Sequence, residues 1–445
     1  MKELSPALFE IRDDLGETHT EVEVYHKRGR SRMLRVTPHG DVFNDRQEEG
    51  WAVRAGDNRR SLFYAAAGTP RSRTEWPEAD GDALRLPSDR LVAPWHAAPT
   101  FETPLISENA ARQFFADLAR ELDTEIPGAR LVLGEISDGR SESAFLTSRG
   151  TEAQVPHRVA ALYLEATVRR RASAPTITPP PSSVTLKLAA RSAESLTRQA
   201  LAQRLADRLE ILLRGKTPLR DRGELLLAPA VAVRLFAAMR DLWVGPQAAE
   251  RVQPLIDRRG RIGSPVLHLI DDGRLPGGAL EAPVDGEGQP TRAVTLVERG
   301  VFRQSLVAWN QALQAPEQIS GCARRVSWRD LPQPGPTHLY QRPDESTSVG
   351  DLLAGMPRGY YLLDTESPAR LDASRKRFAV RVCGFAIDGG RPTGAVSGAW
   401  LVGSVSTFLN SILAAARDLT FLPLEGGMIG SPTLLLKSLE LRQRP

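Results

Sequence analysis

The sequence predicts a mixed α+β fold: largely antiparallel sheets with flanking helices, an N-terminal α/β region and a β-rich C-terminal domain. Three observations support this class. Residues 20–26 alternate apolar and acidic side chains, as a half-buried strand does. Residues 193–214 carry leucines at helical spacing. Residues 378–402 contain two strand-like runs around Asp388-Gly389-Gly390, a turn signal. Strands joined by short turns alongside amphipathic helices are typical of α+β architecture.

Length and composition limit the classes of protein that fit. The 445 residues suggest two or three domains, and 41% hydrophobic with 25% charged residues is normal for a globular chain. The net charge is only +4, and the basic clusters are short, so no nucleic-acid partner is predicted. Two cysteines exclude a disulfide framework, and the acidic N-terminus does not resemble a signal peptide. We therefore expect a cytoplasmic protein.

The first 70 residues are predicted to form a small sheet domain. Residues 31–36 are expected to form a second strand that pairs with 20–26. Runs 51–56 and 61–66 flank a turn-rich link and predict a hairpin. Residues 71–104, rich in proline and charge, are predicted to be a linker.

Residues 105–218 are predicted to form a central α/β domain. Ser107 is a candidate N-cap for a helix that reaches Asp123. Strands are expected in segments 130–136, 144–147 and 160–168, followed by an extended polyproline segment over 175–183. One helix is expected over 193–214, ending at Gly215.

The C-terminal domain is predicted to cover residues 219–445. It should open with strand 225–227 and a helix from Pro229 to about Trp243. Later elements are expected at 266–270, 293–297, 301–307, 378–387, 395–402 and 433–441. The run from Gly394 to Ala416 lacks charge and is long enough to span a bilayer. Its periodicity changes from strand-like to helical, so it predicts a buried strand and a core helix over 404–418, not a membrane span.

A search for catalytic motifs finds no complete constellation. The chain has no His-Glu-x-x-His, phosphate loop or Gly-x-Ser-x-Gly elbow. His268 lies in an apolar run and is predicted to be structural, and no role for His338 follows from the sequence. The acidic group of Asp271, Asp272, Asp285 and Glu287 can bind a hard cation, but capping of turns is the commoner use. Cys322 precedes two arginines that can lower a thiol pKa, so a catalytic cysteine remains an alternative.

Spaced motifs in the C-terminal domain resemble the TldD/PmbA family. They are the Asp-Asp and Leu-Pro-Gly of 270–278, the Asp-x-Glu-Gly-x-Pro-Thr of 285–291, the hairpin after it, the Gly-Tyr-Tyr of 358–364 and the closing Gly-Ser-Pro of 427–435. Gly286 departs from the acidic residue of the second motif. The residues that carry the resemblance are Asp271, Asp272, Pro276, Gly277, Asp285, Glu287, Gly288, Pro290, Thr291, Gly430, Ser431 and Pro432. Each of them individually is expected to support turns and strands.

The resemblance also implies which branch of the family the chain follows. The catalytic branch carries His-Glu-x-x-x-His for zinc on a helix that falls at 231–243 here, where Phe236, Ala237 and Asp241 occupy the matching positions. Neither an aromatic ring nor a methyl group replaces an imidazole or a general-base carboxylate. The family's ligand cysteine is absent from 419–429.

The chain therefore resembles the TldE/PmbA-type subunit. The resemblance implies no catalytic or metal-binding residue in this chain, a TldD-like partner subunit that holds the zinc, and unfolded peptide as substrate. The interpretation of 394–416 as a buried strand and helix predicts no membrane partner. Two alternatives remain open. One is a stand-alone homo-oligomeric peptide-binding protein. The other is an independent hydrolase that uses Cys322 or the acidic group.

Overall fold

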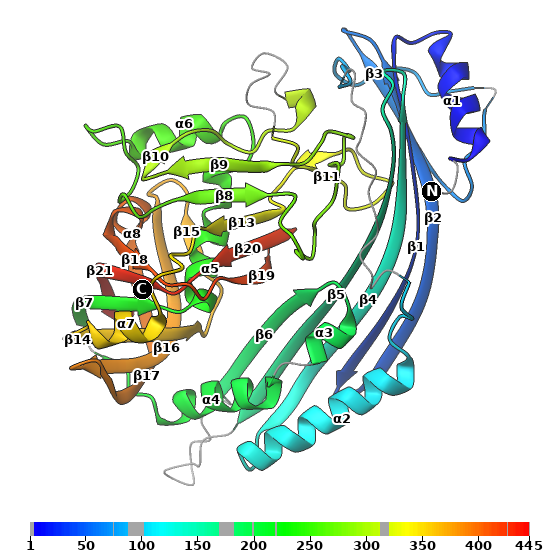
Figure 1. Ribbon diagram of the computed structural model, residues 1–445. Helices are drawn as coiled ribbons and strands as arrows, with labels where there is room; N and C mark the ends of the chain where they lie inside the picture. Colours follow the sequence, from blue (N-terminus) through cyan, green and yellow to red (C-terminus); the bar gives the residue numbers. More distant parts are fainter. Residues whose placement is uncertain are drawn as a thin grey trace.

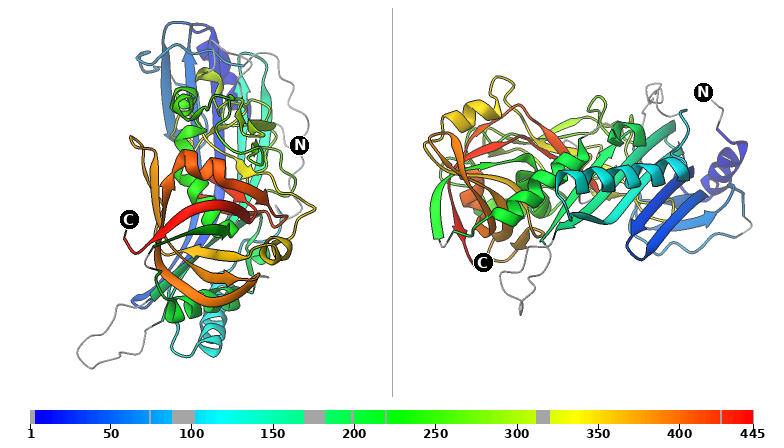
Figure 2. Two further views of the ribbon diagram at one scale, coloured as in Figure 1. Left: turned by 90° about the vertical axis from the view of Figure 1, so that its left-hand side faces the viewer. Right: turned by 90° about the horizontal axis from the view of Figure 1, so that it is seen from below.

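The computed structural model describes residues 4–73, 75–87, 102–168, 182–197, 200–218, 220–311, 320–424 and 426–444. The N-terminal half forms a strongly curved sheet of long strands, and the C-terminal half lies against its concave side (Figure 1). Two further views show that the molecule is elongated along the long strands (Figure 2). The α+β class expected from the sequence is confirmed, with mostly antiparallel strand pairs.

The N-terminal sheet has the strand order β3-β2-β1-β4-β5-β6. Its strands are β1 (Glu21–Thr37), β2 (Gly40–Gly56), β3 (Ser61–Ala67), β4 (Arg130–Thr147), β5 (Glu152–Val168) and β6 (Ser182–Ala190). Strands from the first 70 residues and from the central region thus share one sheet. The hairpin predicted at 51–66 is present as β2 and β3.

The predicted pairing of 31–36 with 20–26 is wrong, because both segments belong to the single strand β1. The strand continues through Gly29, where a β-carbon would lie only 3.0–3.1 Å from Arg140 and Ser141 of β4. The chain turns only after Thr37, where Gly40 has a positive φ of 133°. β1 then pairs with β2 along its whole length.

Helices cover the convex face of this sheet. They are α1 (Pro6–Gly16), α2 (Glu108–Glu125), α3 (Ala193–Thr197) and α4 (Leu201–Arg214). The Ser107 hydroxyl accepts a hydrogen bond from the Ala110 N–H, as predicted for an N-cap. The single helix predicted over 193–214 is two helices instead. Leu196 and Leu201 are both buried, and five residues of continuous helix would turn them to different sides. The predicted polyproline segment falls mostly outside the described residues.

The C-terminal half contains two large sheets and one small strand pair. A six-stranded sheet has the order β10-β9-β8-β13-β20-β19, and a seven-stranded sheet follows β14-β7-β21-β17-β16-β15, with β18 paired to β21. The first comprises β8 (Leu269–Asp272), β9 (Ala293–Glu298), β10 (Val301–Phe302), β13 (His338–Gln341), β19 (Thr420–Leu424) and β20 (Gly427–Ser431). The second comprises β7 (Arg220–Leu227), β14 (Arg358–Thr365), β15 (Arg370–Asp372), β16 (Arg377–Asp388), β17 (Arg391–Ser404), β18 (Ile412–Ala415) and β21 (Leu434–Arg442). The small pair is β11 (Ala323–Arg324) and β12 (Gln333–Pro334).

The helices of this half are short. They are α5 (Pro229–Ala238), α6 (Ala248–Val252), α7 (Val349–Ala354) and α8 (Val405–Ser411). The helix predicted to reach Trp243 ends at Ala238, and a 3₁₀ turn covers Arg240–Leu242. The helix predicted over 404–418 ends at Ser411, because Ile412 and the residues after it pair with β21. Within the described part of the chain, no helix combines the length and apolar character needed to cross a membrane.

Candidate functional site

A groove runs between α5 and the free edge of the N-terminal sheet. Two adjoining cavities of about 440 and 300 Å³ share Thr185 and Lys187 of β6, Arg234 of α5 and Leu422 of β19. β5 contributes Tyr163 to the larger cavity. β6 is the last strand of its sheet, so its outer edge has no strand partner among the described residues. An edge strand beside a groove can accept an extended peptide through main-chain hydrogen bonds.

The helix α5 presents different residues to the groove and to the core. Arg234, Ala237 and Ala238 line the larger cavity. Phe236 is only 1% exposed and packs edge-on against Phe408, with ring centroids 5.5 Å apart. Asp241 lies beyond the end of α5, with its side chain 75% exposed. Of the three positions singled out on this helix, only Ala237 borders the groove.

An ion-pair cluster fixes the groove face of α5. Asp364 of β14 accepts hydrogen bonds from Arg234 at 2.8 Å, and it pairs with Arg208 of α4 at 3.0 Å. Asp364 is buried, and both arginines are mostly buried. Arg234 also donates to the Ala230 carbonyl oxygen at 2.7 Å. The cluster therefore joins α4 of the N-terminal half to α5 and β14 of the C-terminal half.

The first family motif forms the end of β8. The Asp271 carboxylate is buried and accepts a hydrogen bond from the Thr337 N–H at 2.8 Å. Burial raises its pKa to about 7. Asp272 caps the following turn by accepting from the Arg274 N–H at 2.8 Å. In the next turn, over 275–278, Gly277 has a φ of 75°, which favours glycine. Pro276 precedes it.

The second motif is a loop organised around Asp285. Its carboxylate accepts hydrogen bonds from the N–H groups of Glu287, Gln289 and Ala323 at 2.8–2.9 Å. Burial, and then the neighbouring Glu287 charge, raise the pKa of Asp285 to about 7. Gly288 has a φ of 77°. The contacts made by Asp285 are those of a loop-forming residue.

The remaining motif residues make contacts of the same kind. The Thr291 hydroxyl donates a hydrogen bond to the Ala282 carbonyl oxygen, and Pro290 forms an isolated antiparallel β-bridge with Val284. On β20, the Ser431 hydroxyl donates to the Pro432 carbonyl oxygen at 2.8 Å. Gly430 lies under Phe421, where a β-carbon would come within 2.6 Å of the ring. The tertiary fold thus brings the 271 and 430 motifs into one sheet, because β13 pairs with both β8 and β20.

His338 and Cys322 lie close to these motifs. His338 Nδ1 is 2.9 Å from the Asp272 carbonyl oxygen, and burial lowers its pKa to about 4. Cys322 is 1% exposed, and burial, with the Asp271 and Asp285 charges, raises its pKa well above the ordinary value. The neighbouring arginines do not produce the reactive thiol that the sequence allowed. Within the described ranges, no three His, Cys, Asp or Glu side chains converge as a metal site.

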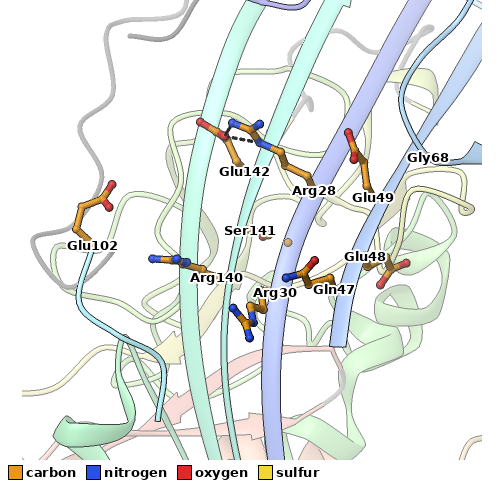
Figure 3. A pocket seen from close by; sticks show the side chains of 11 residues that line it. Arg28, Arg30, Gln47, Glu48, Glu49, Gly68, Glu102, Arg140, Ser141 and Glu142 are labelled. Carbon is orange, nitrogen blue, oxygen red and sulfur yellow. Dashed lines mark hydrogen bonds and ion pairs between the residues drawn. The ribbon is translucent and has the colours of Figure 1, made fainter. Parts of the chain in front are cut away.

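A charged hollow of about 870 Å³ lies on the other face of the N-terminal sheet (Figure 3). Arg28 donates to Glu142 at 2.9 and 2.5 Å. Arg30 makes a bidentate pair with Asp45 at 2.7 and 2.6 Å. The lining also contains Glu48, Glu49, Glu102 and Arg140, so acids and bases are nearly balanced. This balance favours solvated surface over a site for one class of charged ligand.

Several site residues were missed by sequence reasoning. Lys187 and Arg234 in the groove, and Lys27 and His157 in a further cavity, were not singled out. Strand alternation places Lys27 on the same face of β1 as Glu23, but the sequence does not show which part of the chain packs against that face.

Comparison with known proteins agrees with the motifs. A model of the PmbA/TldA metallopeptidase C-terminal domain matches residues 220–443, which is half of the chain. Two curated relatives are the metalloprotease TldD homologs of Haemophilus influenzae, 27% identical over 176 residues, and of Buchnera aphidicola subsp. Schizaphis graminum, 23% identical over 160 residues. These matches cover 38% and 36% of this chain, and only about a third of each relative (36% and 33%).

The fold extends the similarity over the whole length. The crystal structure of TldE from Thermococcus kodakarensis superposes with a TM-score of 0.82 at 17% identity, covering 98% of this chain and 100% of the other. At this identity the likeness establishes the fold, and the family model establishes the relationship. The chain belongs to the PmbA/TldD metallopeptidase family.

Proposed function

We propose that this chain is the non-catalytic, TldE/PmbA-like subunit of a heterodimeric zinc metallopeptidase. The zinc and the general base would come from a TldD-like partner, and this chain would help to hold unfolded peptide. The observation that carries the proposal is the groove face of α5. This face presents Arg234, Ala237 and Ala238 to the groove, and the Arg234 guanidinium donates a hydrogen bond to Asp364. Neither the methyl groups nor the guanidinium are ligands that zinc uses in proteins.

The groove supports the peptide part of the proposal. Its floor includes the edge strand β6, whose side chains alternate between the core and the cavity: Leu186 is buried, while Thr185 and Lys187 line the groove. A peptide added to such an edge is bound mainly through its backbone. Recognition of this kind tolerates many sequences, as a peptidase for unfolded chains requires.

The proposal is tested by mixing the purified chain with a TldD-type protein and measuring mass by light scattering after size exclusion. We expect a complex with one copy of each chain. Peptide cleavage should appear in the mixture and disappear with a zinc chelator, and this chain alone should not cleave. A homodimer that ignores the partner would favour the stand-alone peptide-binding alternative. Cleavage by this chain alone would contradict the assignment.

A matched variant pair tests which chain supplies the chemistry. Replacing the first histidine of the partner's His-Glu-x-x-x-His should abolish cleavage without changing the mass of the complex. Asp241→Asn in this chain should leave both unchanged, because the Asp241 side chain is exposed and lies outside the groove. Loss of cleavage with Asp241→Asn would assign chemistry to this chain and reject the proposal.

A further inference from the structure

A second cavity, of about 170 Å³, lies between the concave face of the N-terminal sheet and the loops that carry the family motifs. β1 contributes Lys27, β4 contributes Ser143 and β5 contributes His157. Arg324 and Thr337 close it from the C-terminal half. The cavity is therefore built by both halves of the chain.

Lys27 and Arg324 are two cations in this cavity, and neither is in direct contact with an acidic side chain among the described residues. Within the described residues, neither side chain has an ion pair or hydrogen bond, although both are at least half-buried. Other cations nearby are paired: Arg325 with Glu23, and Arg191 with Glu281. Of these four cations, Lys27 and Arg324 are the two without an ion-pair partner in the described part of the chain.

The neighbouring acids do not fill the role of counter-ion. All the described hydrogen bonds of the Asp285 carboxylate come from backbone N–H groups, and Asp271 accepts from the Thr337 N–H. Glu48 on β2 pairs with Arg329 at 3.3 Å and acts on Lys27 only at longer range. Asp285 also lines the cavity, and the Asp271 and Asp285 charges act on Arg324. Neither acid forms an ion pair with Lys27 or Arg324, so both cations can still donate hydrogen bonds to a ligand.

The electrostatic consequences appear on three groups. Burial lowers the pKa of Lys27. The Glu48 charge raises this pKa, and the Arg324 charge lowers it. Burial also lowers the pKa of Arg324, although the Asp271 and Asp285 charges act in the opposite direction. Burial, followed by the Arg324 and Lys27 charges, lowers the pKa of His157 to about 4, so the imidazole is neutral at physiological pH. Like charges held together in a low-dielectric pocket are stabilised by an anion between them.

We propose that this cavity binds a carboxylate group, held by charge-assisted hydrogen bonds from Lys27 and Arg324. Its volume suits one carboxylate and the group that bears it. The Thr337 and Ser143 hydroxyls are further polar groups in the lining.

The carboxylate is that of a peptide, an assignment that rests on the proposed function. His157 lines this cavity and Tyr163 lines the α5 groove, and both belong to the side of β5 that faces the C-terminal half. Six residues of strand separate them by about 20 Å. An extended peptide of about the same number of residues can therefore reach from one site to the other.

The first experiment uses the isolated chain and a minimal probe. N-acetylglycine carries the carboxylate, N-acetylglycinamide is its neutral match, and inorganic phosphate is a second anion. Calorimetric titration and thermal unfolding should show that N-acetylglycine binds and stabilises the protein and that the amide does not. Equal effects of acid and amide, or binding of phosphate alone, would overturn the carboxylate assignment.

Variants identify the residues. Lys27→Met and Arg324→Gln should each weaken N-acetylglycine binding about 10-fold or more, and Lys27→Arg should retain most of it. Arg329→Gln is the control, because Arg329 is exposed on the same loop and lies over the Trp328 ring. Unchanged affinity in both cavity variants would reject the site. The two cavity variants lie in different halves of the chain, so the test still stands if one of them fails to fold.

The second experiment distinguishes the source of the carboxylate. A neutral hexapeptide with a free C-terminus is compared with its amide and with an amidated hexapeptide that contains one glutamate. If the hexapeptide with a free C-terminus binds most tightly, the cavity binds the C-terminal carboxylate. If the amidated peptide with glutamate binds most tightly, the cavity binds an acidic side chain. Equal binding of all three rejects the proposal. Neither experiment needs the partner or cleavage, so this result and the test of subunit pairing can fail independently.

Discussion

Glu23 and Arg325, 302 residues apart in the sequence, form a buried ion pair between β1 and the loop that follows β11. Arg54 of β2 completes the cluster through bidentate hydrogen bonds to Glu23 at 3.0 and 2.6 Å. Burial alone would raise the pKa of Glu23, but the Arg325 and Arg54 charges outweigh it and hold the pKa below its ordinary value. The cluster fastens the C-terminal loops to the N-terminal sheet.

Glu23→Gln should therefore destabilise the protein strongly. It leaves two arginines buried with less negative charge nearby, and removal of one partner from a buried pair costs about 3–5 kcal/mol. The free energy of unfolding in urea measures the effect. Glu48→Gln, which breaks the exposed pair with Arg329, is the matched control and should change stability by no more than about 1 kcal/mol. Equal losses in the two variants would contradict the role of the cluster.

Asp271 should make stability depend on pH. Its folded pKa is about 7 and its ordinary value is 3.8, so between these values the folded state holds a proton that the unfolded state has lost. Stability from this group is present below about pH 4 and is lost as pH rises to about 7. Asp271→Asn should thus gain stability relative to the wild type as pH rises from about 4 to about 7 in urea unfolding, and the difference should stay constant above pH 7. Asp272→Asn is the control, because it removes a charge at the adjacent position. If the stability difference between Asp271→Asn and the wild type did not change with pH, the raised pKa of Asp271 would be refuted.

Gly430→Ala tests whether a family-motif glycine serves packing. The new methyl would lie 2.6 Å from the Phe421 ring and 2.9 Å from Tyr340, so we expect a loss of about 1–3 kcal/mol. Gly16→Ala is the control, because nothing lies within 4 Å of its β-carbon position. Thermal and urea unfolding compare the two. A fully stable Gly430→Ala that loses peptide binding would instead assign the glycine to the substrate.

The thiols should be inert in the folded protein. Cys322 and Cys383 are each 1% exposed, and burial raises the pKa of both. Iodoacetamide should label neither at pH 8 until the chain is unfolded, as mass spectrometry will show. Rapid labelling of native Cys322 would revive the cysteine hydrolase alternative. Cys322→Ala separates labelling at the two positions.

Ala238→Trp should obstruct the groove beside α5. Ala238 lines the larger cavity and is partly exposed, so an indole there occupies space proposed for peptide. Peptide binding, and cleavage by the mixture with a TldD-type protein, should fall at least several-fold while stability changes little. Ala249→Trp, on the exposed face of α6, should leave binding intact. Undiminished binding to Ala238→Trp would place the peptide elsewhere.

The α+β class, the hairpin at 51–66 and the helix that begins at Pro229 could be predicted from the sequence, because these depend on local periodicity and turn residues. It also carried the family motifs, whose order in the chain is enough to indicate a relationship. Element boundaries were less secure: the segment after Ser411 has helical spacing, yet it pairs with β21 because tertiary hydrogen bonds outweigh weak propensity.

Which side chains meet depends on the tertiary structure and could not be predicted from the sequence. Packing of the C-terminal loops against the N-terminal sheet brings Arg325 to Glu23 and places Lys27 and Arg324 in one cavity. No local pattern encodes a contact between residues some 300 positions apart. Likewise, the rotation of α5 about its own axis places Phe236 in the core and Arg234 in the groove. A shift of one residue in a strand would turn every one of its side chains to the other face, so the sites exist only once the whole sheet has formed.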